Sequence, residues 1–229
     1  MKIGTRVAAI VGSALLLTPS PGLAELILDQ VIVDIEADQR ARSDIEISNA
    51  GTETMYIVVE PYEILNPGLE NEKRVQLENP TLSRVFVSPR KVILQPGERS
   101  LIRIVGLGDR PKQDRVFRLT IRPVVGDLNS EEDALKVLVG YDALVLLRAD
   151  KELGEVVGIR TGKKLVLENR SNSAREFFDG IQCDAAGQKC QSLPSKRLYP
   201  RQSFVVNLPY DTGAKYQTAV GEEIDTRSY

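Results

Sequence analysis

Short runs rich in β-branched residues repeat along almost the whole chain, and helical periodicity is nearly absent. Gly, Pro, Asn and Asp bound these runs and favour turns between them. A first set of expected strands covers 26–35, 42–48, 55–65, 84–87, 92–94, 100–106, 115–123 and 134–148. A second set covers 156–160, 164–168, 176–183, 189–191 and 203–208. The pattern predicts an all-β protein with two β-sandwich domains, the first with the strand count of an immunoglobulin-like sandwich.

The first 24 residues are predicted to be a signal peptide. Lys2 and Arg6 precede an apolar run over 7–17 that is too short to span a bilayer, and small residues precede a cut after Ala24. The alternative interpretation is a buried N-terminal helix. The domains are then expected at 25–150 and 151–229, in a mature chain without membrane insertion, located in the periplasm. The polar tail over 221–229 is expected to be disordered.

The charge pattern excludes several classes of function. The chain has 30 basic and 32 acidic residues without a basic block, which argues against a nucleic-acid partner. It has no histidine, so the commonest general base and the commonest metal ligand are absent. Paired acids at 131–132 and 222–223 lie in expected turns or tails, where adjacent carboxylates are usually solvated. The sequence therefore predicts neither an enzyme nor a cofactor.

Both cysteines, Cys183 and Cys190, lie in one short segment. In an oxidising compartment such a pair predicts a disulfide that closes a hairpin loop. A metal site would need two further ligands, and no other His or Cys supplies them.

The segment 134–148 is unusually long for a strand, at 15 residues against the usual five or six. With a period of two, Leu135, Val137, Val139 and Tyr141 point to one face. One interpretation is an open apolar edge that a partner uses by strand addition. The other is a strand buried between two sheets, which also gives a continuous apolar run.

Basic side chains alternate with apolar ones in the expected strand 115–123. Arg118 and Arg122 lie on one face, opposite Phe117 and Ile121. Such residues usually form a solvated outer face. The alternative is an anion anchor, because arginine binds carboxylates through two parallel hydrogen bonds.

Three stretches, 45–51, 87–104 and 117–123, resemble the first domain of PapD-like periplasmic pilus chaperones of the chaperone–usher pathway. The middle stretch is the most specific, since it matches the family pattern P-x4-L-x-P-G-x2-S-x2-R from Pro89 to Arg103. The resemblance continues through 135–148, similar to the family's strand G1, and through the cysteine hairpin. The second half looks closest to the alternate branch, which serves colonisation-factor fimbriae.

The resemblance implies two immunoglobulin-like sandwiches in an L-shaped, boomerang arrangement. It implies that the chain binds pilus or fimbrial subunits, each an immunoglobulin-like fold without its last strand. Strand G1 would complete that fold by donor-strand complementation, with Leu135, Val137, Val139 and Tyr141 filling the groove. The complex would then pass to an outer-membrane usher. A homodimer that caps the edge of G1 is a further expectation.

The sequence departs from the family at the anchor for the subunit's terminal carboxylate. Better-known members carry an arginine on the first strand and a lysine on G1, whereas 26–35 contains no basic residue and the matching G1 position falls near Leu144. The anchor candidates are Arg118, Arg122, Arg148 and Tyr56. The family's proline after the G1 arginine is replaced by Ala149, which leaves the interdomain angle open.

The competing hypothesis is a structural immunoglobulin-like component of a pilus or the cell surface. A pilus subunit should lack its own last strand and carry a donor arm at its mature N-terminus. The long segment 134–148 and a full second domain favour the chaperone.

Overall fold

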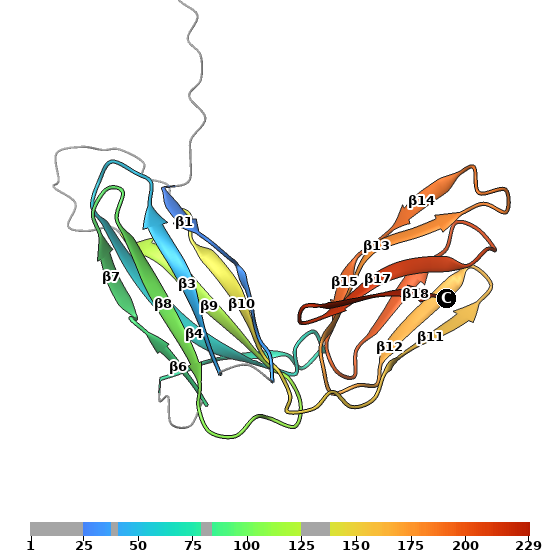
Figure 1. The fold of residues 1–229 in the computed structure, drawn as a ribbon, viewed down its shortest axis with the longest axis horizontal. Coiled ribbons are helices and arrows are strands. Elements are labelled where there is room, and N and C mark those ends of the chain that lie inside the picture. Colours follow the sequence, from blue (N-terminus) through green and yellow to red (C-terminus); the bar gives the residue numbers. More distant parts are fainter. Residues whose placement is uncertain (1–24, 38–40, 79–83, 125–137) are drawn as a thin grey trace, which may run out of the picture.

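The computed structural model describes residues 25–37, 41–78, 84–124 and 138–229. All secondary-structure elements within these ranges are β-strands. The strands form two groups that meet in a V, as Figure 1 shows. The prediction of an all-β, two-domain fold is therefore confirmed. The predicted signal peptide, residues 1–24, lies outside the described ranges. Within them the structure contains no helix long and apolar enough to cross a bilayer.

The first group, β1 to β10, forms two sheets that face each other. One sheet has the strand order β1-β3-β8-β6; the other has β2-β10-β9-β4-β5, with β7 also paired to β4. The strands are β1 Leu26–Leu28, β2 Ile32–Ile35, β3 Arg42–Asn49, β4 Met55–Leu65, β5 Lys73–Gln76, β6 Val85–Ser88, β7 Lys91–Leu94, β8 Arg99–Gly106, β9 Arg115–Val124 and β10 Tyr141–Leu147.

The second group, β11 to β18, also forms two sheets. Their orders are β11-β12-β16 and β14-β13-β17-β18, with β15 paired to β13. The strands are β11 Val156–Thr161, β12 Lys164–Asn169, β13 Arg175–Cys183, β14 Cys190–Leu193, β15 Lys196–Leu198, β16 Ser203–Asn207, β17 Ala214–Val220 and β18 Glu223–Ser228.

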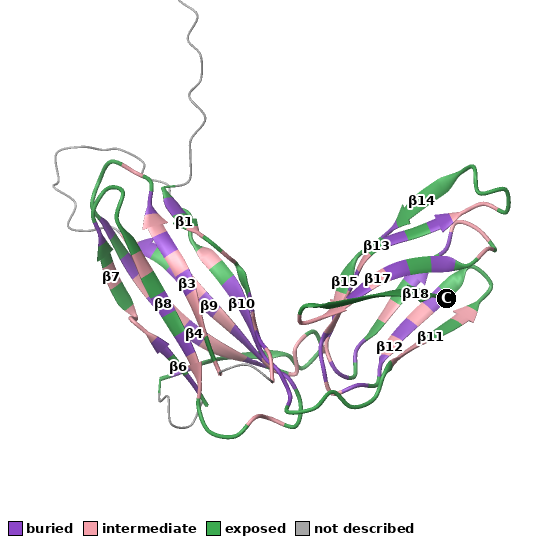
Figure 2. Cartoon of the chain, viewed as in Figure 1, coloured by how far each residue is buried: buried purple, intermediate pink, exposed green. Residues whose placement is uncertain are grey.

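Each group has its own apolar core, as the alternating buried and exposed bands of Figure 2 indicate. Side chains at every second position point between the sheets, so Phe117 of β9 packs with Ile45 of β3 in the first core. In the second core Phe177 and Tyr216 meet edge to face, with ring centroids 5.9 Å apart. Two separate cores allow each group to bury its own sheets. The domain boundary expected at residue 150 stays a prediction.

Two sequence-based expectations about the ends of the chain were wrong. The expected strand 26–35 is two strands: β1 pairs with β3 in one sheet, and β2 pairs with β10 in the other. The tail 221–229 is not disordered, because β18 pairs with β17 along its whole length. Tyr229 also exchanges two backbone hydrogen bonds with Ala214. A partner strand satisfies this backbone although every side chain of β18 is exposed.

The two groups are joined by polar contacts around Arg148, directly after β10. Its guanidinium donates to both carboxylate oxygens of Asp34 at 2.6 and 2.5 Å, to Asp114 Oδ2 at 2.7 Å and to the carbonyl of Ala174 at 2.7 Å. Asp114 also accepts from the backbone N–H groups of Ala149 and Ala174. We call these contacts the Arg148 network. They connect the end of β10 to the second group of strands.

Candidate functional site

Strand β10 has different neighbours along its two halves. On one side β9 pairs with it from Tyr141 to Leu147. On the other side β2 pairs with it in parallel only from Leu144 to Leu147. Among the described strands, none lies beside Tyr141–Ala143 on that second side. We call residues 138–143 the free edge and residues 144–147 the paired half.

The paired half is buried on both faces. Val145 and Leu147 point into the first core. Leu144 and Leu146 point outward, but they pack in a second apolar cluster with Ile64, Val116 and Tyr199, the last from the second group of strands. This explains the continuous apolar run, and in this half the buried-strand interpretation is correct.

The predicted donor residues fall only partly within the description. Leu135 and Val137 lie outside the described residues. Val139 is 53% exposed, and residues 138–140 precede β10 without being part of it. Tyr141 opens β10, is half-buried, and its hydroxyl donates to the carbonyl of Leu26 at 2.9 Å. Within the described residues the strand thus begins at Tyr141.

An ion pair fixes the start of β10 from the far side of its sheet. Arg74 of β5 donates to Asp142 Oδ2 at 3.0 Å and to Oδ1 at 2.6 Å, and its Nη2 also donates to Thr120 Oγ1 at 2.5 Å. Its guanidinium lies 4.2 Å from the ring centroid of Tyr62 on β4. The Thr120 hydroxyl donates to Asp142 Oδ1 at 3.0 Å. We call these contacts the Arg74 bridge.

The contacts within the Arg74 bridge shift the pKa values of both Asp142 and Arg74. Partial burial opposes ionisation of Asp142, but hydrogen bonds from Arg74 and Thr120 outweigh it and lower the pKa of Asp142. The hydrogen bond to Asp142 raises the pKa of Arg74. Both groups are therefore charged at neutral pH. A shallow groove of about 430 Å³, lined by Arg74, Arg122 and Leu138 among others, lies beside them.

Two anchor candidates, Arg118 and Arg122, lie on the outer face of β9. Arg118 is directly opposite Leu144 in the register, donates to the Asp142 carbonyl at 3.1 Å, and its side chain is 35% exposed. Arg122 forms an ion pair with Glu60 at 3.1 Å. Arg118 is therefore the anchor candidate beside Leu144, near which the resemblance implied a lysine on strand G1.

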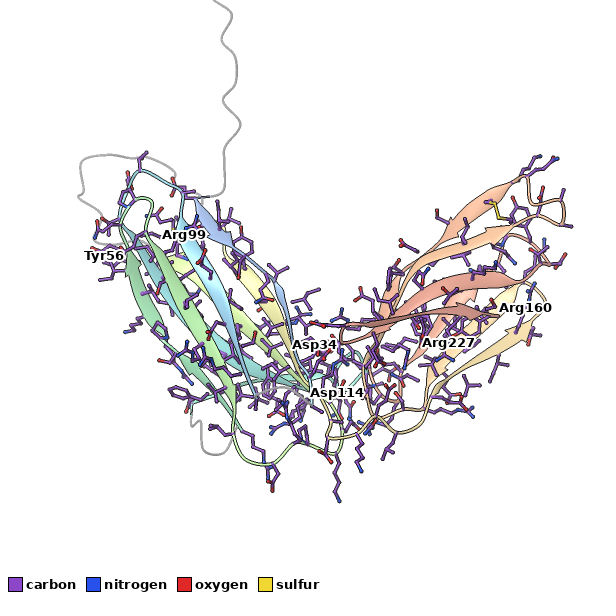
Figure 3. All side chains as sticks on the ribbon, viewed as in Figure 1. Asp34, Tyr56, Arg99, Asp114, Arg160 and Arg227 are labelled. Carbon is purple, nitrogen blue, oxygen red and sulfur yellow. A yellow bond between two sulfur atoms is a disulfide. The ribbon has the colours of Figure 1, made fainter. Side chains whose placement is uncertain are left out.

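The other two anchor candidates are less suited to binding a partner's carboxylate. Arg148 is buried, and its guanidinium already binds Asp34, Asp114 and a backbone carbonyl. Burial alone would lower its pKa, but the hydrogen bond to Asp34 and the two negative charges raise it, so it stays charged. Figure 3 places Tyr56 at the opposite end of the first sandwich from Asp34 and Asp114. The burial and the contacts of Arg148 favour a structural role for it.

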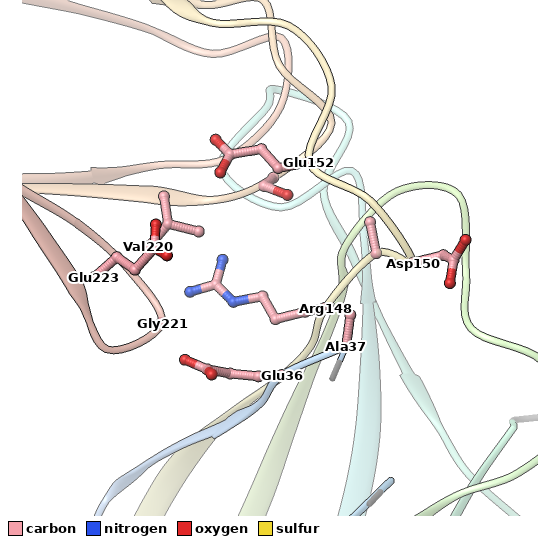
Figure 4. A pocket seen from close by; sticks show the side chains of 10 residues that line it. Glu36, Ala37, Arg148, Asp150, Glu152, Val220, Gly221 and Glu223 are labelled. Carbon is pink, nitrogen blue, oxygen red and sulfur yellow. The ribbon is translucent and has the colours of Figure 1, made fainter. Parts of the chain in front are cut away.

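The Arg148 network borders a cavity of about 290 Å³ between the two groups of strands, which Figure 4 shows. Glu36 lies on one side of this cavity and the β17–β18 turn on the other. Glu36 Oε1 accepts from the backbone N–H of Glu222 at 2.7 Å. A second hydrogen bond between the two groups runs from Arg201 to Asn66 Oδ1, at 3.2 Å. These two hydrogen bonds add to the Arg148 network in joining the two groups.

The predicted disulfide is confirmed. Cys183 ends β13, Cys190 begins β14, and the two residues are paired across the hairpin. The bond therefore closes a local loop at the tip of the second sandwich, far along the chain from β10.

Sequence reasoning missed two residues that hold β10 in place, Arg74 and Asp114. Arg74 lies on the short strand β5, which no alternation of apolar residues marks. Asp114 precedes β9 and is buried, with its side chain 0% exposed. A buried aspartate cannot be recognised from its own residue type, because its partners come from distant segments.

No protein-family model matches the chain. Two Escherichia coli proteins are similar to it in sequence, and both are named as fimbrial subunits, one of CS1 fimbriae and one of CFA/I fimbriae. The CS1 protein is 28% identical over 171 residues, and the CFA/I protein is 25% identical over 173 residues. Each alignment covers 70% of this chain and 71% of the relative.

Solved structures align over more of the chain. The class 5 fimbriae chaperone CfaA aligns with a TM-score of 0.64 and 22% identity over 89% of this chain and 98% of that chain. One chain in the structure of the Salmonella enterica SafA pilin in complex with the SafB chaperone aligns with a TM-score of 0.62 and 17% identity, over 92% of this chain and 98% of that chain. The chain therefore has the two-domain, all-β fold of the fimbrial chaperones.

Proposed function

We propose that the chain is a periplasmic chaperone that binds fimbrial subunits by lending them a β-strand from the free edge. The observation that carries this proposal is the uneven pairing of β10. Residues 144–147 are paired on both sides, whereas Tyr141–Ala143 pair only with β9 among the described strands. The fold of the fimbrial chaperones and the relatives named as fimbrial proteins support it.

The chemistry of such an edge fits an incomplete immunoglobulin-like partner. Unpaired backbone N–H and C=O groups on a strand edge form hydrogen bonds with a strand of another chain. Within the free edge Val139 presents an exposed apolar side chain, and the predicted donor residues Leu135 and Val137 precede it at alternate positions. Each such side chain, when buried in a groove, contributes about 1.5–3 kcal/mol.

The alternative, a structural pilus component, is less well supported. The first sandwich contains its own last strand, since β10 completes the sheet between β2 and β9. A pilus component that needs a donated strand would leave that position empty. The chaperone fold also argues for a binding role without catalysis.

Location and anchoring follow as parts of the same proposal. The predicted signal peptide and the disulfide support a periplasmic location. Arg118 is proposed as the anchor for the subunit's terminal carboxylate, since its side chain is partly exposed beside Leu144. Delivery to an outer-membrane usher and a self-capping homodimer stay predictions.

The test is co-expression of the full chain with the fimbrial subunits encoded by its neighbouring genes, followed by purification from the periplasm. The wild-type chain should form a one-to-one complex with a small β-rich subunit. Val139→Asp should abolish or strongly weaken this complex, because it places a charge in the subunit's groove. Arg118→Gln should weaken it as well.

Val205→Asp is the matched control, since Val205 is 48% exposed and lies on β16 of the second sandwich. This variant should bind as the wild type does. A wild-type chain that recovers no subunit, or a Val139→Asp variant that binds like the control, would contradict the proposed function.

A further inference from the structure

The first residues of β10 have a described partner strand on one side only, whereas the rest of the strand is paired on both sides. Side chains of other strands nevertheless form several hydrogen bonds with Asp142. Asp142 has no partner strand on the β2 side among the described residues. Its carboxylate instead accepts three hydrogen bonds, two from Arg74 and one from Thr120. Its backbone carbonyl accepts a further one from Arg118.

The Arg74 bridge crosses two strands, β4 and β9, to join β5 to β10. In the sheet order β2-β10-β9-β4-β5, Arg74 on β5 lies over Tyr62 of β4, contacts Thr120 of β9 and ends at Asp142 of β10. A single side chain therefore restrains the strand next to the edge from the opposite end of the sheet.

A second contact restrains the residues just before β10. A Cβ added to Gly140 would lie 2.8 Å from Cβ of Arg122 and 3.1 Å from the carbonyl oxygen of Ile121. The backbone at Gly140 thus lies directly against β9, and only glycine permits this approach. Together, Gly140 and the Arg74 bridge hold the free edge against the sheet.

The bridge contributes little to global stability. The side chains of Arg74 and Asp142 are 39% and 43% exposed, and ion pairs with this exposure are weak because water and salt screen them. A weak contact can still matter for binding, since a strand that is already ordered loses less conformational freedom when a partner pairs with it.

From these observations, and resting on the proposed function, we infer that Arg74 is a positioning residue for strand donation. Through Asp142 it orders residues 138–143 before a fimbrial partner binds, so that the backbone of the free edge is presented in a pairing-competent conformation. Arg74 itself does not contact the partner in this role.

The experiment compares Arg74→Gln with the wild type in the full chain. Two measurements are made: the dissociation rate of the purified chaperone–subunit complex, and hydrogen exchange of the backbone amides 138–143 in the free chain. Arg74→Gln should speed dissociation by roughly 3–10-fold and increase exchange of those amides, without a change in the thermal midpoint of more than a few degrees. Asp142→Asn should act similarly, and the double variant should add little to either.

Arg103→Gln is the matched control. Arg103 forms an equivalent two-bond pair with Asp44, at 2.8 and 3.0 Å, but on the other sheet of the same sandwich. It should leave both measurements unchanged. The inference is overturned if the Arg74→Gln complex dissociates as slowly as the wild-type complex, or if its amides 138–143 exchange at the wild-type rate. A wild-type chain that binds no fimbrial subunit overturns the proposed function instead, and this role with it.

Discussion

The free edge and the paired half differ in what surrounds them, although they follow one another along the chain and share β10. Residues 144–147 have a strand on each side and apolar neighbours on both faces. In the free edge, Tyr141–Ala143 pair only with β9 among the described strands, the Arg74 bridge lies over one face, and Val139 is exposed. The paired half ends in the Arg148 network, which reaches the second sandwich.

The difference teaches how one segment can serve both folding and binding. A strand that was open along its whole length would be an aggregation hazard, and one that was paired along its whole length would have no edge to lend. Here the buried residues 144–147 lie toward the junction of the two sandwiches, and the exposed Val139 lies at the other end of the segment. The comparison predicts that substitutions in the paired half change stability, whereas substitutions at the free edge change binding.

The largest expected effect is on stability, from Arg148→Met. The substitution leaves Asp34 and Asp114 without their cationic partner, and the Asp114 side chain is 0% exposed. Removing one member of such a buried group should lower the free energy of unfolding by about 3–5 kcal/mol. Urea unfolding of the purified variant measures this loss.

Arg122→Met is the control for that prediction, because the Arg122–Glu60 pair is at the surface. It should cost less than about 1 kcal/mol. If Arg148→Met were as mild as this control, the Arg148 network would not hold the end of β10, and the contrast between the two halves would fail.

A pair of alanine substitutions tests the contrast within β10 and the residues before it. Leu146→Ala should cost about 2–5 kcal/mol, since Leu146 is fully buried against Ile64, Val116 and Tyr199 and truncation leaves a cavity. Val139→Ala should stay within about 0.5 kcal/mol, because its side chain is largely exposed. Equal losses in urea unfolding would show that the free edge is packed as tightly as the paired half.

Much of this strand could be predicted from its residue alternation. The continuous apolar run fits a strand buried between two sheets, which is one of the two interpretations left open, and residues 144–147 are buried in this way. Alternation could not decide between an edge strand and a buried one, because both give continuous apolar runs. The structure confirms the buried strand for residues 144–147, whereas the use of the free edge by a partner stays a proposal.

The remaining features depend on contacts between distant segments. The break between β1 and β2 follows from a change of sheet. Asp29 and Gln30 interrupt the apolar residues of 26–35 at this point, but two polar residues do not reveal that the chain changes sheet. The strand β18 has exposed side chains throughout, so only its backbone pairing identifies it. Arg74 and Asp142 are 68 residues apart, and no local pattern links two charged residues at that separation.

A smaller effect is expected from Tyr141→Phe, at the first residue of β10. The Tyr141 hydroxyl donates to the Leu26 carbonyl and so ties the start of β10 to β1 of the facing sheet. Losing one such hydrogen bond should cost about 0.5–1.5 kcal/mol. Urea unfolding measures the cost, and a loss below the error of the measurement would mean that β1 does not restrain this end of β10.

The smallest expected effect is the pH dependence of the Arg74 bridge. Partial burial acts to raise the pKa of Asp142, but the hydrogen bonds from Arg74 and Thr120 outweigh it, so the folded-state pKa is lowered. In the unfolded chain the pKa of an aspartate is about 3.9. The folded state therefore binds fewer protons there, so the contribution of Asp142 is present above about pH 4 and is lost as the pH falls through its lowered folded pKa.

Other carboxylates titrate in the same range, and Asp44 also has a lowered pKa in its pair with Arg103. The measurement is therefore the difference in unfolding free energy between the wild type and Asp142→Asn, in which the other groups cancel. At neutral pH this difference should be constant and no larger than about 1 kcal/mol, because both side chains of the pair are partly exposed. Below about pH 4 it should shrink toward zero. A difference that grew on acidification would mean that Asp142 is more readily protonated in the folded chain, which would contradict the charged bridge at the start of β10.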